Sequence, residues 1–254
     1  MDLLAGTTEA VRQAALLVVR GARPATTEEL TAALQANDRA VADVLRPALT
    51  GALPGAGWTT DEHADGPMPA GDWWVVDPVG GNLNAVYGMP DWNIGVSLVR
   101  DGRPALAVVH FPATGEMFTA TAGGGTLLNG VPVRASAKTD LAVALTGTGQ
   151  AKPDRDPAHA ERVGAAVAAM MRNALYVRAS VPVGHQLAQV AAGRMDVHWQ
   201  FDNLRSHIAP VLLAREAGAT VTDLGGNPWE IASTGYLAAA PGLHAAALDV
   251  LKGL

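Results

Sequence analysis

Apolar residues near the start of the chain recur at the spacing of an α-helix. Residues 3–20 mix them with Glu9 and Arg12, so this segment is predicted to form an amphipathic helix rather than a signal peptide. A second helical pattern leads into "NDRAVADVLRPAL", with Asn37 or Asp38 as the predicted N-cap. No stretch stays apolar for long enough to predict a membrane span.

The pattern then changes to short β-prone runs. Turn residues such as those of "RDGRP" and "PATGE" separate these runs, and Asn129-Gly130 in "LLNGVPVRAS" is a strong hairpin signal. We expect an antiparallel or mixed sheet with helices on one side. The predicted strands are residues 73–77, 94–99, 105–111 and 116–122.

The second part of the chain alternates strand and helix patterns, which is typical of an α/β unit. No linker separates it from the first part. The N-terminal α+β half, residues 1–140, and the C-terminal α/β half, residues 141–254, are therefore expected to form one compact unit with the site between them. The predicted order is strand 141–148, helix 159–172, strand 175–180, helix 184–193, strand 195–200, helix 206–218 and strand 219–224.

Composition narrows the class of protein. The 254 residues are 49% hydrophobic, which is enough to bury a core, and the absence of cysteine excludes disulfides, thiolate metal sites and a cysteine nucleophile. A formal charge of −6 without a basic cluster argues against nucleic acid as a partner. We expect a cytoplasmic protein that acts on a small molecule, and the richness in Ala, Arg, Gly and Pro points to an actinobacterial source.

The stretch "WWVVDPVGGNLNAVYGMPDW" begins as a metal-binding loop does. A strand of Trp and Val leads to Asp77 and a Pro-led turn, which holds a carboxylate rigidly at the end of a strand. A second carboxylate does not follow, because Gly80, Gly81 and Asn82 occupy the next positions. One acid is therefore present where a two-metal site needs several.

Together with other segments, this stretch resembles the inositol monophosphatase family. That family's "DPIDGT" loop is followed by an Asn, an aromatic-Pro turn, a Ser-bearing strand and a GGG…LNG hairpin, as in "DPVGGNLNAVYGMPDWNIGVSLV" and "AGGGTLLNG". "ANDRAVADVL", "DEHAD", "VAAGRMDVHWQ" and "LLAREAGATVTDLGG" are similar to further family segments. The resemblance implies a layered α-β-α-β-α sandwich, a phosphomonoesterase whose Mg²⁺ ions are held by carboxylates from three loops, and a homodimer.

The resemblance carries over only part of the family's site. Asp61 and Glu62 match its paired-acid loop, Asp77 matches its strand-end Asp, and Asp38 matches a nearby carboxylate. The chain departs from the family where the second Asp of the loop is Gly80. Other departures are Asn82 for its Thr, Gln200 for an acid near the substrate and Val181-Pro182 for its Gly-Ser pair.

The family's "WD" motif is also altered. It corresponds to Arg205-Ser206, or to Ser206-His207 if the alignment shifts by one residue, and the metal-binding Asp is absent in both registers. The acid nearest to this motif is Asp202. Loss of two metal-binding carboxylates predicts that a two-metal cluster does not form.

The sequence therefore predicts an enzyme repurposed for acid–base chemistry on a small metabolite, without a cofactor, in a biosynthetic pathway of secondary metabolism. Cyclisation, dehydration, isomerisation and imine chemistry all fit. The predicted catalytic residues are Asp77, Glu62, Asp61 and His207, and the predicted substrate-binding residues are Asn82, Gly80, Gly81, Arg205, Ser206, Gln200 and Asp202.

Two alternatives stay open. The first is a residual Mg²⁺-dependent phosphatase of a sugar or cyclitol phosphate, in which Arg205 holds the phosphate. One metal ion would then bind weakly to Asp61, Glu62, Asp77 and the Val79 carbonyl. The second is a non-catalytic descendant that binds a ligand or a partner.

Overall fold

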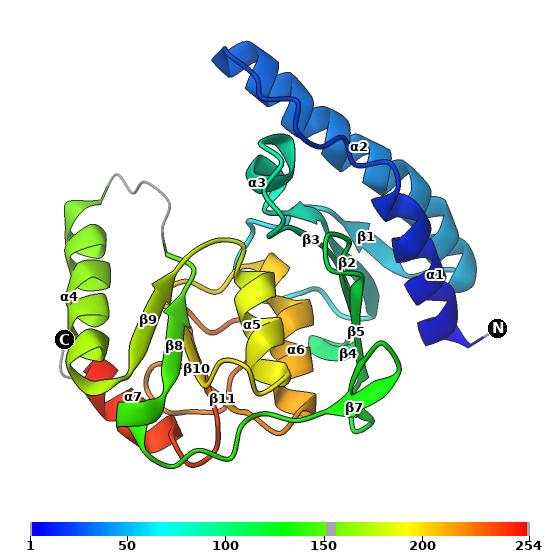
Figure 1. Ribbon diagram of the computed structural model, residues 1–254. Coiled ribbons are helices and arrows are strands. Elements are labelled where there is room, and N and C mark those ends of the chain that lie inside the picture. Colours follow the sequence, from blue (N-terminus) through cyan, green and yellow to red (C-terminus); the bar gives the residue numbers. More distant parts are fainter. Residues whose placement is uncertain (1, 151–155, 253–254) are drawn as a thin grey trace.

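The computed structural model describes residues 2–150 and 156–252, and Figure 1 shows its layers. In these residues two helices cover one face of a seven-stranded sheet, and two more lie between this sheet and a five-stranded one. A further helix pair covers the outer face of the second sheet. The layered α-β-α-β-α order is confirmed. None of the described helices has both the length and the apolar character that a bilayer crossing requires.

Helix α2 (Thr27–Ala52) starts earlier than predicted. The Thr26 hydroxyl accepts a hydrogen bond from the Glu29 N–H at 3.2 Å, and the Glu29 carboxylate reaches back to the preceding backbone. The Thr26 side chain thus satisfies one of the free N–H groups of the first turn, and the Glu29 carboxylate accepts from the Ala25 N–H just before the helix. The predicted N-cap at Asn37 or Asp38 is therefore wrong, and both residues lie inside the helix, where their side chains are available for other contacts.

Helix α1 (Leu3–Ala15) is shorter than the predicted segment 3–20. Beyond it the chain runs extended, and the side chain of Asn37 holds it there. The Asn37 Oδ1 atom accepts a hydrogen bond from the Val19 N–H at 2.8 Å, and its Nδ2 donates to the Val19 carbonyl at 3.1 Å. A buried amide on α2 thus replaces the helical hydrogen bonds that α1 does not continue.

The first sheet pairs its strands in chain order, with β1 parallel to β2 and the others antiparallel. The predicted hairpin is confirmed, since Asn129 and Gly130 connect β6 to β7 with φ angles of 49° and 80°. Helix α3 (Asn82–Val86) follows β2. The strands are β1 (Gly57–Thr59), β2 (Asp72–Gly80), β3 (Asn93–Arg100), β4 (Arg103–Phe111), β5 (Glu116–Thr121), β6 (Gly125–Leu128) and β7 (Val131–Val133).

Both faces of this sheet are covered, although α1 and α2, the long helices of its own half, lie on one side as predicted. Along β2, the buried Trp74 and Val76 pack in the core cluster that contains α1 and α2. Val75 points to the other face and packs in the cluster that contains residues of α5 and α6. The second face is closed by helices from the C-terminal half, which the local pattern of the strands does not reveal.

The second sheet has the strand order β11-β12-β10-β8-β9 and follows the predicted alternation, to which the structure adds β12 and α7. The division of the chain at residue 140 remains a prediction. The strands are β8 (Leu145–Thr148), β9 (Tyr176–Ala179), β10 (Val197–Gln200), β11 (Thr220–Thr222) and β12 (Tyr236–Ala239). The helices are η1 (Leu141–Val143), α4 (Pro157–Asn173), α5 (Val183–Ala191), η2 (Arg205–His207), α6 (Ile208–Glu216) and α7 (His244–Lys252).

The side chains of His198, Tyr236 and His207 form a buried cluster between the second sheet and η2. The His198 Nδ1 atom lies 3.2 Å from the Tyr236 hydroxyl, the two rings stack at 5.8 Å, and the His207 ring meets Tyr236 edge-on at 5.5 Å. Burial, and to a lesser extent the neighbouring His207, lower the pKa of His198 from 6.5 to about 3. His198 is therefore neutral in the folded protein at neutral pH.

This burial predicts a loss of stability in acid. Between pH 6.5 and about 3 the unfolded chain protonates His198 whereas the folded chain does not. The unfolded state then binds more protons, so the free energy of unfolding falls as pH falls, by about 1.4 kcal/mol per pH unit. We expect His198→Phe to show a shallower slope in urea unfolding from pH 6.5 to 4.5. His63→Gln, which changes an exposed histidine, should keep the parental slope; equal slopes in parent and His198→Phe contradict the prediction.

Candidate functional site

Strand β2 carries Asp77 to the edge of the first sheet. The pairing of β2 with β3 is regular up to Asp77, shifts between Asp77 and Gly80, and resumes with Gly80 opposite Asn93. Gly81 then adopts a left-handed conformation with φ of 75° and starts α3. A Cβ atom at Gly81 would lie 2.9 Å from the Pro182 ring, so glycine lets this turn pass close to the segment before α5.

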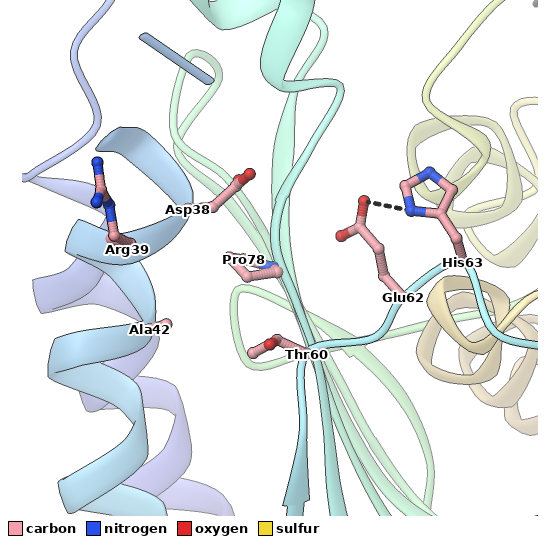
Figure 2. A pocket seen from close by; sticks show the side chains of 7 residues that line it. All are labelled: Asp38, Arg39, Ala42, Thr60, Glu62, His63 and Pro78. Carbon is pink, nitrogen blue, oxygen red and sulfur yellow. Dashed lines mark ion pairs between the residues drawn. The ribbon is translucent and has the colours of Figure 1, made fainter. Parts of the chain in front are cut away.

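A cavity of about 320 Å³ lies next to this turn. Asp38 reaches it from α2 and Glu62 from the loop after β1, and Figure 2 shows the two side chains on either side of Pro78. The Glu62 Oε1 atom is 3.5 Å from His63 Nδ1, a contact that is an ion pair only when the histidine is protonated. The residues that line the cavity are Asp38, Arg39, Ala42, Thr60, Glu62, His63 and Pro78.

The cavity carries negative charge. Burial, and to a lesser extent the charge of Glu62, raise the pKa of Asp38 to about 6, while the hydrogen bond from Asn82 acts in the opposite direction. The negative charges of Asp38 and Glu62 repel each other, and a cation or a proton between the two carboxylates relieves this repulsion. The structure therefore supplies an electrostatic reason for a positive ligand here.

Asn82 fixes the position of Asp38. Its Nδ2 donates to Asp38 Oδ1 at 2.8 Å and to the Leu34 carbonyl at 2.9 Å, and its Oδ1 accepts from Asn37 Nδ2 at 3.0 Å. Both amide hydrogens are used within the protein. Asn82 was predicted to bind substrate, but these contacts favour a positioning role that ties α3 to α2.

The segment η2 brings the second half of the chain to the cavity. The Arg205 N–H donates to the Ala64 carbonyl at 2.9 Å, and the Ser206 N–H donates to the Glu62 carbonyl at 3.0 Å. The Arg205 Nε atom is buried and meets no hydrogen-bond acceptor among the described residues. A half-buried guanidinium with an unused donor is suited to binding an anion.

Other predicted residues have interior or surface positions. His207 is buried against Tyr236, and its Nδ1 accepts from the Leu204 N–H at 3.1 Å. Gln200 is also buried, and its Oε1 accepts from Thr148 Oγ1 at 3.0 Å. These contacts favour structural roles for both residues.

Two predicted acids also lie outside the cavity lining. Asp202 is half-buried and accepts a hydrogen bond from Gln200 Nε2 at 3.2 Å. Asp61 is exposed, unlike its neighbour Glu62, which lines the cavity. The two members of the predicted acid pair therefore have different surroundings.

The structure thus brings together Glu62, Asp38 and the turn at Asp77, with Arg205 and Ser206 bound to the Glu62 loop. Sequence reasoning missed three residues. Arg39 and His63 line the cavity and directly follow Asp38 and Glu62 in the sequence, so their position next to these acids could have indicated them. Asn93 lies opposite Gly80, and nothing in the local sequence pattern indicates its place at the site.

Comparisons with known proteins agree with the fold. A model described as "Inositol monophosphatase family" matches residues 2–252. The probable inositol 1-monophosphatase ImpA of Mycobacterium tuberculosis is 36% identical, over 76% of this chain and 73% of its own length. The Nus factor SuhB of Pseudomonas aeruginosa is 32% identical, over 75% and 71%. The solved structure of the Thermotoga maritima IMPase covers 100% of this chain and 98% of its own, with a TM-score of 0.83 at 23% identity, which shows the fold alone.

These findings correct two predictions. The prediction of a repurposed enzyme is wrong, because relatives 34–36% identical over most of the chain are named inositol-1-monophosphatases. The prediction of no cofactor is wrong as well, because members of this family are Mg²⁺-dependent. Asp38 and Glu62, two acids that the resemblance carries over, line the cavity together and keep negative charge there. The coarser prediction, that the chain is an enzyme, agrees with the names of these relatives.

Gly80 is predicted to resist replacement by the missing acid. A Cβ atom at this position would lie 2.6 Å from Asp77 Oδ2 and 2.8 Å from Asn93 Nδ2, so a new side chain would force both to move. We expect Gly80→Asp to lower the free energy of unfolding by about 1–3 kcal/mol, as overpacking does. Adding Asn93→Ala should restore part of the loss, as measured by urea unfolding. An unchanged stability in Gly80→Asp contradicts this account.

Proposed function

Because the chain belongs to the inositol monophosphatase family, we propose that it is a Mg²⁺-dependent phosphatase that hydrolyses the monophosphate of a cyclitol or a sugar. The observation that carries the proposal is the cavity in which Asp38 and Glu62 face each other beside the Asp77 turn. The names of the relatives support the reaction class.

The oxygen atoms at this site suit one Mg²⁺ ion. Mg²⁺ prefers hard oxygen ligands, and proteins usually bind it through one or two carboxylates while waters and substrate phosphates complete the octahedron. Among the described residues no group of three or more His, Asp and Glu side chains is arranged to hold a metal. Glu62, Asp77 and the Val79 carbonyl would hold the ion, which supplies charge stabilisation for the phosphate when bound.

Asp38 is placed to handle a proton. Asn82 orients its carboxylate, and the same carboxylate lines the cavity. A carboxylate held in this way accepts a proton from a water molecule that attacks the phosphorus atom. Its orientation is independent of the ligands proposed for the ion, because it depends on α2 and α3.

Arg205 is the proposed phosphate ligand. The hydrogen bond from its backbone N–H to the Ala64 carbonyl places residue 205 beside the Glu62 loop. The buried Nε donor has no acceptor among the described residues and so can serve a phosphate oxygen. Arginine binds phosphate with two parallel hydrogen bonds and keeps its charge at all working pH values.

The finer features remain proposals. We propose a homodimer, supported by the large apolar side chains that the single chain exposes, among them Leu16 at 75% and Val19 at 61%. A cytoplasmic location and an actinobacterial source also remain proposals. One relative is named Nus factor SuhB. If the folded protein releases no phosphate from inositol 1-phosphate or hexose phosphates, a role in binding a partner is favoured instead.

The reaction is tested by phosphate release from inositol 1-phosphate and from hexose phosphates. We expect turnover with Mg²⁺ and none with EDTA. Glu62→Gln should lower kcat/KM by about 10-fold or more and raise the Mg²⁺ concentration that gives half-maximal rate. Asp61→Asn is the matched control, because this neighbouring acid is exposed and does not line the cavity. Equal activity in the two variants rejects the proposed site, and a folded parent without activity rejects the function.

Arg205 has a separate test. We expect Arg205→Gln to raise the KM of the substrate and the inhibition constant of inorganic phosphate by about 10–100-fold, the value of a charge-assisted hydrogen bond. Arg100→Gln, which removes an arginine that pairs with Asp72, should leave both constants unchanged. An Arg205→Gln variant that binds phosphate like the parent shows that another group holds it.

A further inference from the structure

Asn93 is a buried polar residue that lies beside Gly80 and the Asp77 side chain. It starts β3 opposite Gly80 and is 2% exposed. Its Oδ1 atom is buried and meets no hydrogen-bond donor among the described residues. Native proteins rarely bury a carbonyl oxygen without a partner, so an orphan of this kind indicates a bound water, ion or ligand.

The surroundings of Asn93 place its carboxamide beside Asp77. A Cβ atom built on Gly80 lies 2.6 Å from Asp77 Oδ2, 2.8 Å from Asn93 Nδ2 and 3.0 Å from Asn93 Oδ1. Both side chains therefore reach into the same small space, which a side chain at residue 80 would otherwise need. A Cβ atom on Gly184, in the first turn of α5, would lie 2.9 Å from Asn93 Oδ1. Glycine on two elements thus leaves room for the amide.

The chemistry of this space suits a cation. It is bordered by a half-buried carboxylate and by a neutral carbonyl oxygen, and Asn carbonyls are ordinary oxygen ligands of divalent metal ions. A neutral ligand adds coordination without adding the repulsion that a second carboxylate brings when it lies next to the first.

We propose that the Asn93 carboxamide oxygen and the Asp77 carboxylate bind the same divalent cation, so that β3 supplies the ligand that Gly80 on β2 lacks. The inference rests on the proposed Mg²⁺ dependence and names a further protein ligand of that ion. It also explains why Asn93 and Gly80 face each other: the carboxamide occupies the space that a side chain at residue 80 would need.

The test measures cation binding without substrate. Free Mn²⁺ is followed by electron paramagnetic resonance in titrations of the parent, Asn93→Ala, Asn93→Asp and Ser97→Ala, with the fold checked by circular dichroism. We expect Asn93→Ala to weaken Mn²⁺ binding by about 10-fold or more, and Asn93→Asp to strengthen it because it adds a charge. Ser97 is a buried polar residue of the same strand, paired with Val75 instead of with the site, so Ser97→Ala should bind Mn²⁺ like the parent.

The outcomes separate this inference from the proposed function. If Asn93→Ala is folded and binds Mn²⁺ like the parent, the inference is overturned while Mg²⁺-dependent phosphatase activity stands. If Asn93→Ala does not fold, Asn93→Asp decides, because it keeps the shape of the side chain. Weaker binding in Asn93→Asp shows that the amide acts as a hydrogen-bond donor to Asp77, which also overturns the inference. A parent that binds no Mn²⁺ overturns this inference together with the proposed cofactor.

Discussion

Two backbone hydrogen bonds hold the two parts of the candidate site together. The N–H groups of Arg205 and Ser206 donate to the carbonyls of Ala64 and Glu62, and so join the loop after β1 to η2 at the start of α6, which lies between the two sheets. Each sheet has its own core, but the site takes residues from both. Because these bonds use only the main chain, they hold the loops together whatever side chains stand there.

That independence explains how the site keeps its shape while its composition changes. In one of the two possible registers Ser206 stands where the resemblance implies an acid, and its N–H holds the Glu62 loop. The negative charge of the cavity likewise depends on Asp38 and Glu62, which come from other elements. A comparison of sequence motifs shows only which acids are lost at particular positions. The electrostatics of the cavity depend on the acids that remain close to one another, wherever they come from.

Much of the fold follows from local patterns. The hairpin at Asn129-Gly130 and the strand–helix alternation of the second half depend on turn chemistry and periodicity, which the sequence states directly. The start of α2 was predicted wrongly because Asn37 is by residue type as good an N-cap as Thr26, although Thr26 and Glu29 in "TTEE" indicate the earlier start. The covering of the second face of the first sheet follows from the family resemblance but not from the local pattern of its strands, and the place of Asn93 could not be predicted at all, because both depend on contacts between distant segments. For the candidate site, Glu62 and the turn at Asp77 were anticipated, whereas Arg39 and His63 were not.

The amide of Asn37 has a consequence for how the surface and the cavity communicate. The Asn37 side chain forms hydrogen bonds with the backbone of Val19 and with the Asn82 side chain, and Asn82 in turn donates a hydrogen bond to Asp38. A continuous relay of side-chain amides therefore runs from the exposed apolar segment after α1 to the carboxylate in the cavity. A displacement of the segment at Val19 therefore changes the hydrogen bonds of two amides in turn before it reaches Asp38, so the position of this surface segment and the orientation of the carboxylate are mechanically linked.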